Sequence, residues 1–142
     1  TTAPTKGTTI RDRVLVRRVG DTAEGRIEYE QSSTGSNGTG SYLINLPNDV
    51  KIDATKVHIT GGGNLETILG YCSVSNAASG FGASQRKGII VPYTATQIMC
   101  QLYIPGGENS AAFDAGTFGL GTNANLVFIA DYSIPIEGWA GN

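Results

Sequence analysis

The segment Leu126-Val-Phe-Ile-Ala-Asp-Tyr-Ser-Ile-Pro-Ile136 decides the fold of this chain. Every second residue from Leu126 to Ile136 is apolar or aromatic, which is the period of a β-strand that places one face on a core. The alternate positions begin with Val127 and Ile129, so the second face is also apolar where the strand starts. A strand with one face in water should alternate cleanly. We therefore expect this second face to be covered, either by a loop of the same chain or by another subunit.

Short β-forming stretches recur along the whole chain and are separated by clusters of Gly, Asn, Ser and Thr. No window shows the 3.6-residue spacing of an amphipathic helix. This pattern is typical of antiparallel all-β domains, and we predict a jelly-roll-like β-sandwich of about eight strands. The predicted strands lie near residues 12–19, 24–31, 41–46, 55–60, 67–76, 87–92, 97–104 and 126–136.

The length of 142 residues predicts one domain. The polar residues 1–9 are expected to be a linker from an upstream shaft or domain, and residues 10–142 to form a single β-sandwich domain. Cys72 and Cys100 lie in apolar strand-like runs, where a cysteine behaves as a small buried hydrophobe. We expect free thiols at both positions, with a disulfide as the alternative.

The charge pattern argues against two classes of partner. The formal net charge is −2 and charged residues make up 15% of the chain. Binding to nucleic acid phosphates needs clustered Lys and Arg, and the densest group, Arg11, Arg13, Arg17 and Arg18, is interleaved with Asp12 and Asp21. No apolar run approaches the ~18 residues that a membrane-spanning helix needs. We therefore expect neither a nucleic-acid partner nor membrane insertion.

No catalytic set is visible in the sequence. His58 is the only histidine and has no neighbours that suggest a catalytic triad or a zinc site. We therefore expect a protein that is not an enzyme and assign no catalytic residue. Acidic pairs for glycoside hydrolysis remain an alternative, because their separation is set by the fold. We expect no cofactor and no metal site. A calcium ion is the weaker alternative, since the segment 106–125 carries several carboxylate and amide oxygens.

Recognition of a carbohydrate fits the remaining residues better than catalysis does. Tyrosine faces stack on sugar rings, and amide and carboxylate groups bind the hydroxyls. The segment 106–125 is long for a loop in a compact domain, and such loops are commonly functional. The candidate ligand-binding residues are Tyr93, Asn109, Asp114 and Asn123.

Three motifs occur in a fixed order along the chain. They are Val16-Arg-Arg-Val-Gly-Asp21, Leu46-Pro-Asn-Asp-Val-Lys-Ile-Asp53 and Ile134-Pro-Ile-Glu-Gly-Trp139. The ordered set resembles the C-terminal domain of tailed-bacteriophage tail fibre and tailspike proteins. On this resemblance, the structural motif residues are Arg17, Arg18, Gly20 and Asp21 in the first turn, Pro47 and Asp53 in the third connection, and Pro135, Gly138 and Trp139 in the closing segment.

The resemblance implies a trimeric jelly roll similar to those of complement C1q and tumour necrosis factor. It implies a homotrimer in the tail of the virion, assembled in the host cytoplasm, that binds a polysaccharide or other receptor on the bacterial surface. One alternative is a purely structural trimerisation or folding cap, or a virion decoration domain, without receptor binding. A polysaccharide depolymerase module is a less favoured alternative.

Overall fold

The protein is built from β-strands wherever the computed structural model describes it, which is at residues 3–39, 41–59, 67–76, 85–103, 110–112 and 124–138. These residues contain no helix, and therefore none that is long and apolar enough to cross a membrane. The strands are β1 (Thr9–Val19), β2 (Thr22–Gln31), β3 (Leu43–Asn45), β4 (Gly70–Asn76), β5 (Arg86–Thr94), β6 (Gln97–Tyr103), β7 (Ser110–Ala112) and β8 (Leu126–Pro135).

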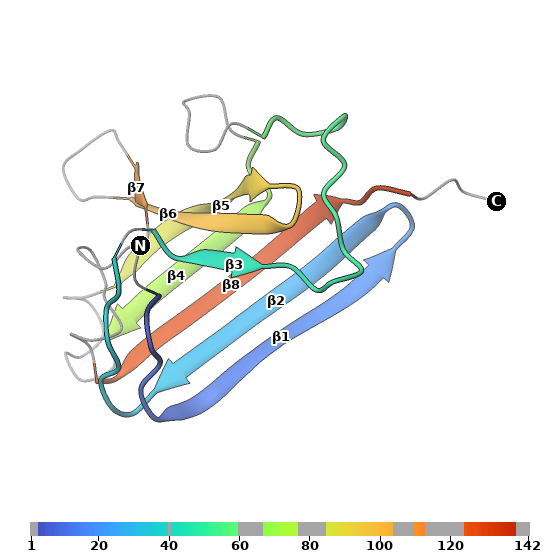
Figure 1. The fold of residues 1–142 in the computed structure, drawn as a ribbon. Helices are drawn as coiled ribbons and strands as arrows, with labels where there is room; N and C mark the ends of the chain where they lie inside the picture. The colour runs from blue at the N-terminus through green and yellow to red at the C-terminus, as the bar shows by residue number, and fades with distance from the viewer. Residues whose placement is uncertain are drawn as a thin grey trace.

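The strands pair in an antiparallel sheet of order β1-β2-β8-β4-β5-β6-β3, and β7 also pairs with β6. This confirms the all-β, antiparallel class predicted from the sequence. The last strand, β8, lies between β2 and β4, so its backbone is hydrogen-bonded on both sides (Figure 1). β8 therefore lies inside the sheet rather than at its edge.

The sheet is curled, so that its two ends share one hydrophobic core. In Figure 1, β6 and β3 cross in front of β4 and β8. The core cluster contains Ile98 of β6 together with Ile27 of β2 and Phe128 of β8, and Ile44 of β3 packs against it. Cys72 and Cys100 are buried in the same core as free thiols. Burial raises the pKa of the Cys100 thiol, as expected for a side chain in apolar surroundings.

The two faces of β8 differ as its sequence predicts. The buried residues are Leu126, Phe128, Ala130, Tyr132 and Ile134. On the opposite face, Val127 and Ile129 are half-buried, whereas Asp131 and Ser133 are exposed. The register places Glu30 beside Val127 and Glu28 beside Ile129 on this outer face. The apolar start of the second face is therefore flanked by charged residues of β2.

Arg11, Arg13 and Arg17 of β1 form ion pairs on the outer face of the β1–β2 hairpin. The carboxylate of Glu28 forms ion pairs with Arg13 at 2.6 Å, with Arg26 at 2.8 Å and with Arg11 at 3.7 Å. Hydrogen bonds from Arg26 and Arg13 lower the pKa of Glu28 and keep it ionised. The cations of this hairpin are thus largely neutralised by its own carboxylates.

One predicted strand is wrong: residues 54–56 form a turn and Val57 a bend, and no strand occurs at 55–59. The Asp53 side chain accepts hydrogen bonds from the Thr55 backbone at 3.0 Å and from the Thr55 hydroxyl at 2.6 Å. Such local bonds compete with a sheet ladder. The β-branched residues at 55–59 led to the predicted strand, but the hydrogen bonds between Asp53 and Thr55 form a turn instead. The short strand β7 was not predicted.

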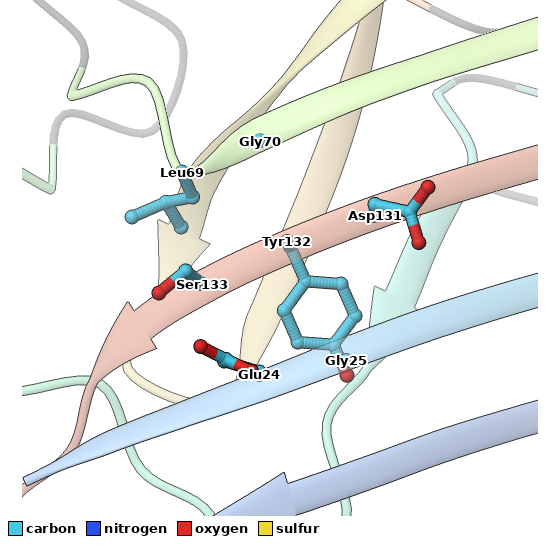
Figure 2. Close-up of a pocket in the computed structure, with 7 residues that line it drawn as sticks. All are labelled: Glu24, Gly25, Leu69, Gly70, Asp131, Tyr132 and Ser133. Carbon is cyan, nitrogen blue, oxygen red and sulfur yellow. The ribbon is translucent and has the colours of Figure 1, made fainter. Parts of the chain in front are cut away.

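A close contact between β2 and β8 depends on a glycine. The ring of Tyr132 lies across the backbone of Gly25 (Figure 2), and a Cβ atom built on Gly25 would overlap the Tyr132 ring. Both residues are buried and stand opposite each other in the register. The tyrosine therefore fills the space that a side chain at residue 25 would need.

We expect Gly25→Ala to destabilise the protein by about 1–3 kcal/mol, the usual cost of overpacking a core. The measurement is the free energy of unfolding from urea denaturation. Ser133→Ala, at an exposed neighbouring position, is the control and should leave stability nearly unchanged. Equal stability of Gly25→Ala and wild type would contradict the packing described here.

Candidate functional site

A groove among the described residues lies between the two ends of the curled sheet. It has a volume of about 820 Å³ and is lined by residues of the edge strands β1 and β3 together with residues of β2, β5 and β8. Among the described residues, β1 pairs only with β2 and β3 only with β6. The groove therefore occupies the seam where the curled sheet does not close.

The floor of the groove is apolar. It includes Ile27, Leu126 and Phe128, which also belong to the core, and Val14, which is 46% exposed at the β1 edge. Tyr29 also lines it, but its hydroxyl donates a 2.6 Å hydrogen bond to the buried Gln31 side chain. Burial, with a smaller contribution from Asp12, raises the pKa of Tyr29 and keeps the hydroxyl protonated. The floor thus offers apolar surface.

The rim of the groove is polar. Lys6 Nζ lies 2.6 Å from a carboxylate oxygen of Asp12 and 5.4 Å from the centre of the Tyr29 ring. On the opposite wall, the side-chain oxygen of Asn45 accepts a 2.9 Å hydrogen bond from Gln97. The amide NH₂ of Asn45 makes no hydrogen bond to any residue that the structure describes. A ligand would therefore meet both charged groups and hydrogen-bond donors at the rim.

Tyr93 reaches the groove because of an irregularity in β5. The β5–β6 register shifts between Pro92 and Thr94, so Tyr93 is an extra residue opposite β6. Bulges of this kind change the direction of a side chain and are frequent beside functional sites. Tyr93 lines the groove together with Tyr42, whose hydroxyl donates to the Asn37 carbonyl at 3.0 Å. Two half-buried tyrosines thus belong to one groove.

The N-terminal segment forms one wall of the groove. Thr5 and Ser36 form an antiparallel bridge, with backbone hydrogen bonds of 3.2 and 2.9 Å. A Cβ atom on Gly7 or Gly35 would overlap the backbone of the facing segment. This tight backbone packing holds Lys6, within the expected linker 1–9, against the groove.

The structure describes only one of the four predicted ligand-binding residues. Tyr93 lies in the groove, whereas Asn109, Asp114 and Asn123 lie outside the described residues. Their role in binding stays a prediction. The sequence did not single out Lys6, Asp12 or Asn45. Only the tyrosine carried a usable signal, because aromatic side chains suit sugar rings and charged or amide residues are common on any surface.

The three sequence motifs meet at the end of β8. The Ile136 backbone donates to the Asp21 carbonyl at 2.9 Å, and the Asp53 backbone donates to the Pro135 carbonyl at 2.9 Å. Lys56 Nζ lies 2.7 Å from Asp21 and 3.6 Å from Asp53. We call these five residues the clasp. It joins the β1–β2 turn and the segment after β3 to the end of β8.

Charge and hydrogen bonding in the clasp shift three pKa values. The hydrogen bond from Lys56, followed by its charge, lowers the pKa of Asp21. Hydrogen bonds from Thr55, and then the charge of Lys56, lower the pKa of Asp53. The hydrogen bond to Asp21 raises the pKa of Lys56. All three groups are thus held in their charged forms.

The remaining motif residues have local structural contacts. Gly20 has φ 62° at the first central position of the two-residue β1–β2 turn, the geometry of a type II′ turn. Arg17 pairs with Glu24 at 2.6 Å, and Arg18 donates to the Gly20 carbonyl at 3.2 Å. The Pro47 carbonyl accepts from Val50, Gly138 has φ 79°, and Trp139 lies outside the described residues.

Outside the groove and the clasp, the described residues offer few groups for catalysis or metal binding. His58 is exposed, and its backbone N–H donates to the Thr67 hydroxyl at 3.0 Å. The described ranges hold no group of three or more His, Cys, Asp or Glu residues that suits a metal ion. A depression of about 350 Å³ beside Tyr132 includes Asp131, which pairs with Arg26 at 3.0 Å (Figure 2).

Comparison of the chain with protein-family models, with curated proteins and with solved structures found no match.

The clasp predicts a pH-dependent stability. A carboxyl group whose pKa is lowered on folding stabilises the native state above its ordinary pKa near 4, and this contribution is lost as pH falls through the lowered value. Lys56→Met removes the shared cation. We therefore expect Lys56→Met to be less stable than wild type near pH 7, and the difference to shrink as pH falls below about 4.

The measurement is urea denaturation of both proteins between pH 7 and the acid range. Lys51→Met is the matched control, because Lys51 is exposed in the same segment and its side chain makes no ion pair with a described residue. A Lys56→Met deficit that is constant across this range would show that the ion pairs do not contribute.

Proposed function

We propose that this chain is the receptor-binding C-terminal domain of a bacteriophage tail fibre or tailspike, and that it binds a bacterial surface polysaccharide in the groove between β1 and β3. Two observations support the proposal. The ordered motifs resemble that group of proteins, and in the folded chain they come together in the clasp. The proposed location is the tail of the virion.

The groove is the observation that carries the binding proposal. Sugar rings present C–H faces that stack on aromatic side chains and hydroxyls that need polar partners. Tyr42 and Tyr93 supply the aromatic surface, while Asp12 and Asn45 supply polar groups. The volume of about 820 Å³ lies within the usual range of ligand sites. This combination fits a saccharide better than an apolar ligand.

We further infer that the curled sheet is a jelly-roll-like sandwich and that three copies associate. The support for association is the exposed apolar side chains of Leu15 and Val19, which lie on the outer face of β1 and are 50% and 49% exposed. Exposed apolar side chains on one face of a strand are typical of interaction surfaces. Three grooves on one trimer would strengthen weak binding to a repeated glycan through effective concentration.

The same exposed side chains favour a second candidate, a structural trimerisation cap or decoration domain that contacts no receptor. A cap of this kind would associate through the exposed β1 side chains and would bind no ligand in the groove. Binding assays with groove variants therefore separate the two functions. A depolymerase remains the third candidate, for which no catalytic residue is assigned.

We expect Tyr93→Ala to weaken binding of the purified protein to host cells or extracted surface glycan by at least about tenfold, because it removes an aromatic contact at the site. Binding is measured by titration of labelled protein. Tyr71→Ala is the control, since Tyr71 is 68% exposed on β4 and does not line the groove. Equal binding by both variants would place the receptor site elsewhere, and no cell binding by wild type would favour the cap.

Light scattering on a sizing column tests the association. We expect a mass of three chains for wild type, and a shift toward smaller species for Leu15→Lys, because a charge then replaces an apolar contact. Ile68→Lys is the matched control, at a position 52% exposed outside β1. A wild-type monomer at micromolar concentration would contradict a self-sufficient trimer.

A further inference from the structure

We propose that the groove selects sugars that carry a methyl group, either in the acetamido group of an N-acetylated amino sugar or at C6 of a 6-deoxy sugar, over sugars that carry hydroxyls alone. This inference rests on the proposed polysaccharide binding and adds the class of sugar unit. It follows from the contrast between the floor and the rim of the groove.

The floor offers a hydroxyl few partners. Ile27, Phe128 and Val14 have apolar side chains, and Tyr29, whose hydroxyl proton is donated to Gln31 at 2.6 Å, is only 8% exposed. A sugar hydroxyl pressed onto this surface would lose its hydrogen bonds to water without gaining new ones. A methyl group in the same place loses no hydrogen bond and removes apolar surface from water.

The rim can satisfy the rest of the sugar. Lys6 and Asp12 stand on one side, and Asn45 stands on the β3 side with an amide NH₂ that is not hydrogen-bonded to a described residue. A sugar ring that lies against the groove tyrosines can direct its hydroxyls to these groups. Its methyl group is then directed to the floor.

Val14 is the floor residue best placed to meet this methyl group. It is 46% exposed, whereas Ile27, Leu126 and Phe128 are 6%, 0% and 4% exposed. Its side chain also shares the face of β1 that meets Ile27 in the register. Val14→Thr preserves the branched shape and the β propensity but replaces a methyl group with a hydroxyl.

The experiment is an NMR titration of the ¹⁵N-labelled full chain with matched pairs of monosaccharides. N-acetylglucosamine is compared with N-formylglucosamine, which keeps the amide but lacks the methyl group, and L-fucose with L-galactose. We expect at least one methyl-bearing sugar to bind about tenfold or more tightly than its partner without the methyl group, the usual discrimination for one apolar group in a pocket. The pair that shows the difference identifies the source of the methyl group.

Val14→Thr should reduce this preference, whereas Ile68→Thr, at a similarly exposed position away from the groove, should retain it. Equal affinity within both pairs would overturn the selection and leave polysaccharide binding standing. A preference that Val14→Thr does not change would overturn the role of the floor. Failure of every sugar to bind, together with absent binding to cells, would overturn both this inference and the proposed function.

Discussion

The double pairing of β8 is the constraint on which the rest of the structure depends. This strand is hydrogen-bonded to β2 along one edge and to β4 along the other, and its inner face lies in the core. Each neighbouring strand has a glycine where β8 packs closely against it. Gly25 of β2 lies beneath the ring of Tyr132, and a Cβ atom on Gly70 of β4 would overlap the backbone of Asp131. Because a one-residue slip would reverse every side chain of a strand, these contacts hold β2, β8 and β4 in a single register. The clasp then holds the end of β8 against the turn between β1 and β2.

The groove is a consequence of the same arrangement. With β8 in the centre, the two ends of the sheet are β1 and β3, and the curl brings these edges toward each other without pairing them. The core residues remain covered along this seam, whereas Val14 of β1 and Leu43 of β3 beside them are 46% and 36% exposed. Polar residues of the N-terminal segment and β3 border this opening. An apolar floor inside a polar rim suits an amphipathic ligand, and a sugar with an apolar substituent is one of these.

Sequence patterns located most strands because a period of two and β-branched residues are local signals. They failed at residues 55–59, where Asp53 bonds to Thr55 and closes a turn, and they missed the three-residue strand β7. In the groove, Tyr93 was predicted from its side-chain type alone. Lys6, Asp12 and Asn45 were not, since a lysine, an aspartate or an asparagine on a surface carries no sign of what faces it. Tyr93 itself lines the groove only because of the bulge after Pro92.

The sequence by itself determined that this chain is an antiparallel β protein, which residues of β8 face the core, and that a turn follows β1 at Gly20. These properties depend on neighbouring residues, on the alternation of side chains and on the backbone freedom of glycine. Only the tertiary structure decided that the three motifs meet in the clasp and that residues from both ends of the sheet line one groove. The physical reason is that strand order and curl depend on contacts between distant segments, such as Arg26 with Asp131, which no local pattern encodes.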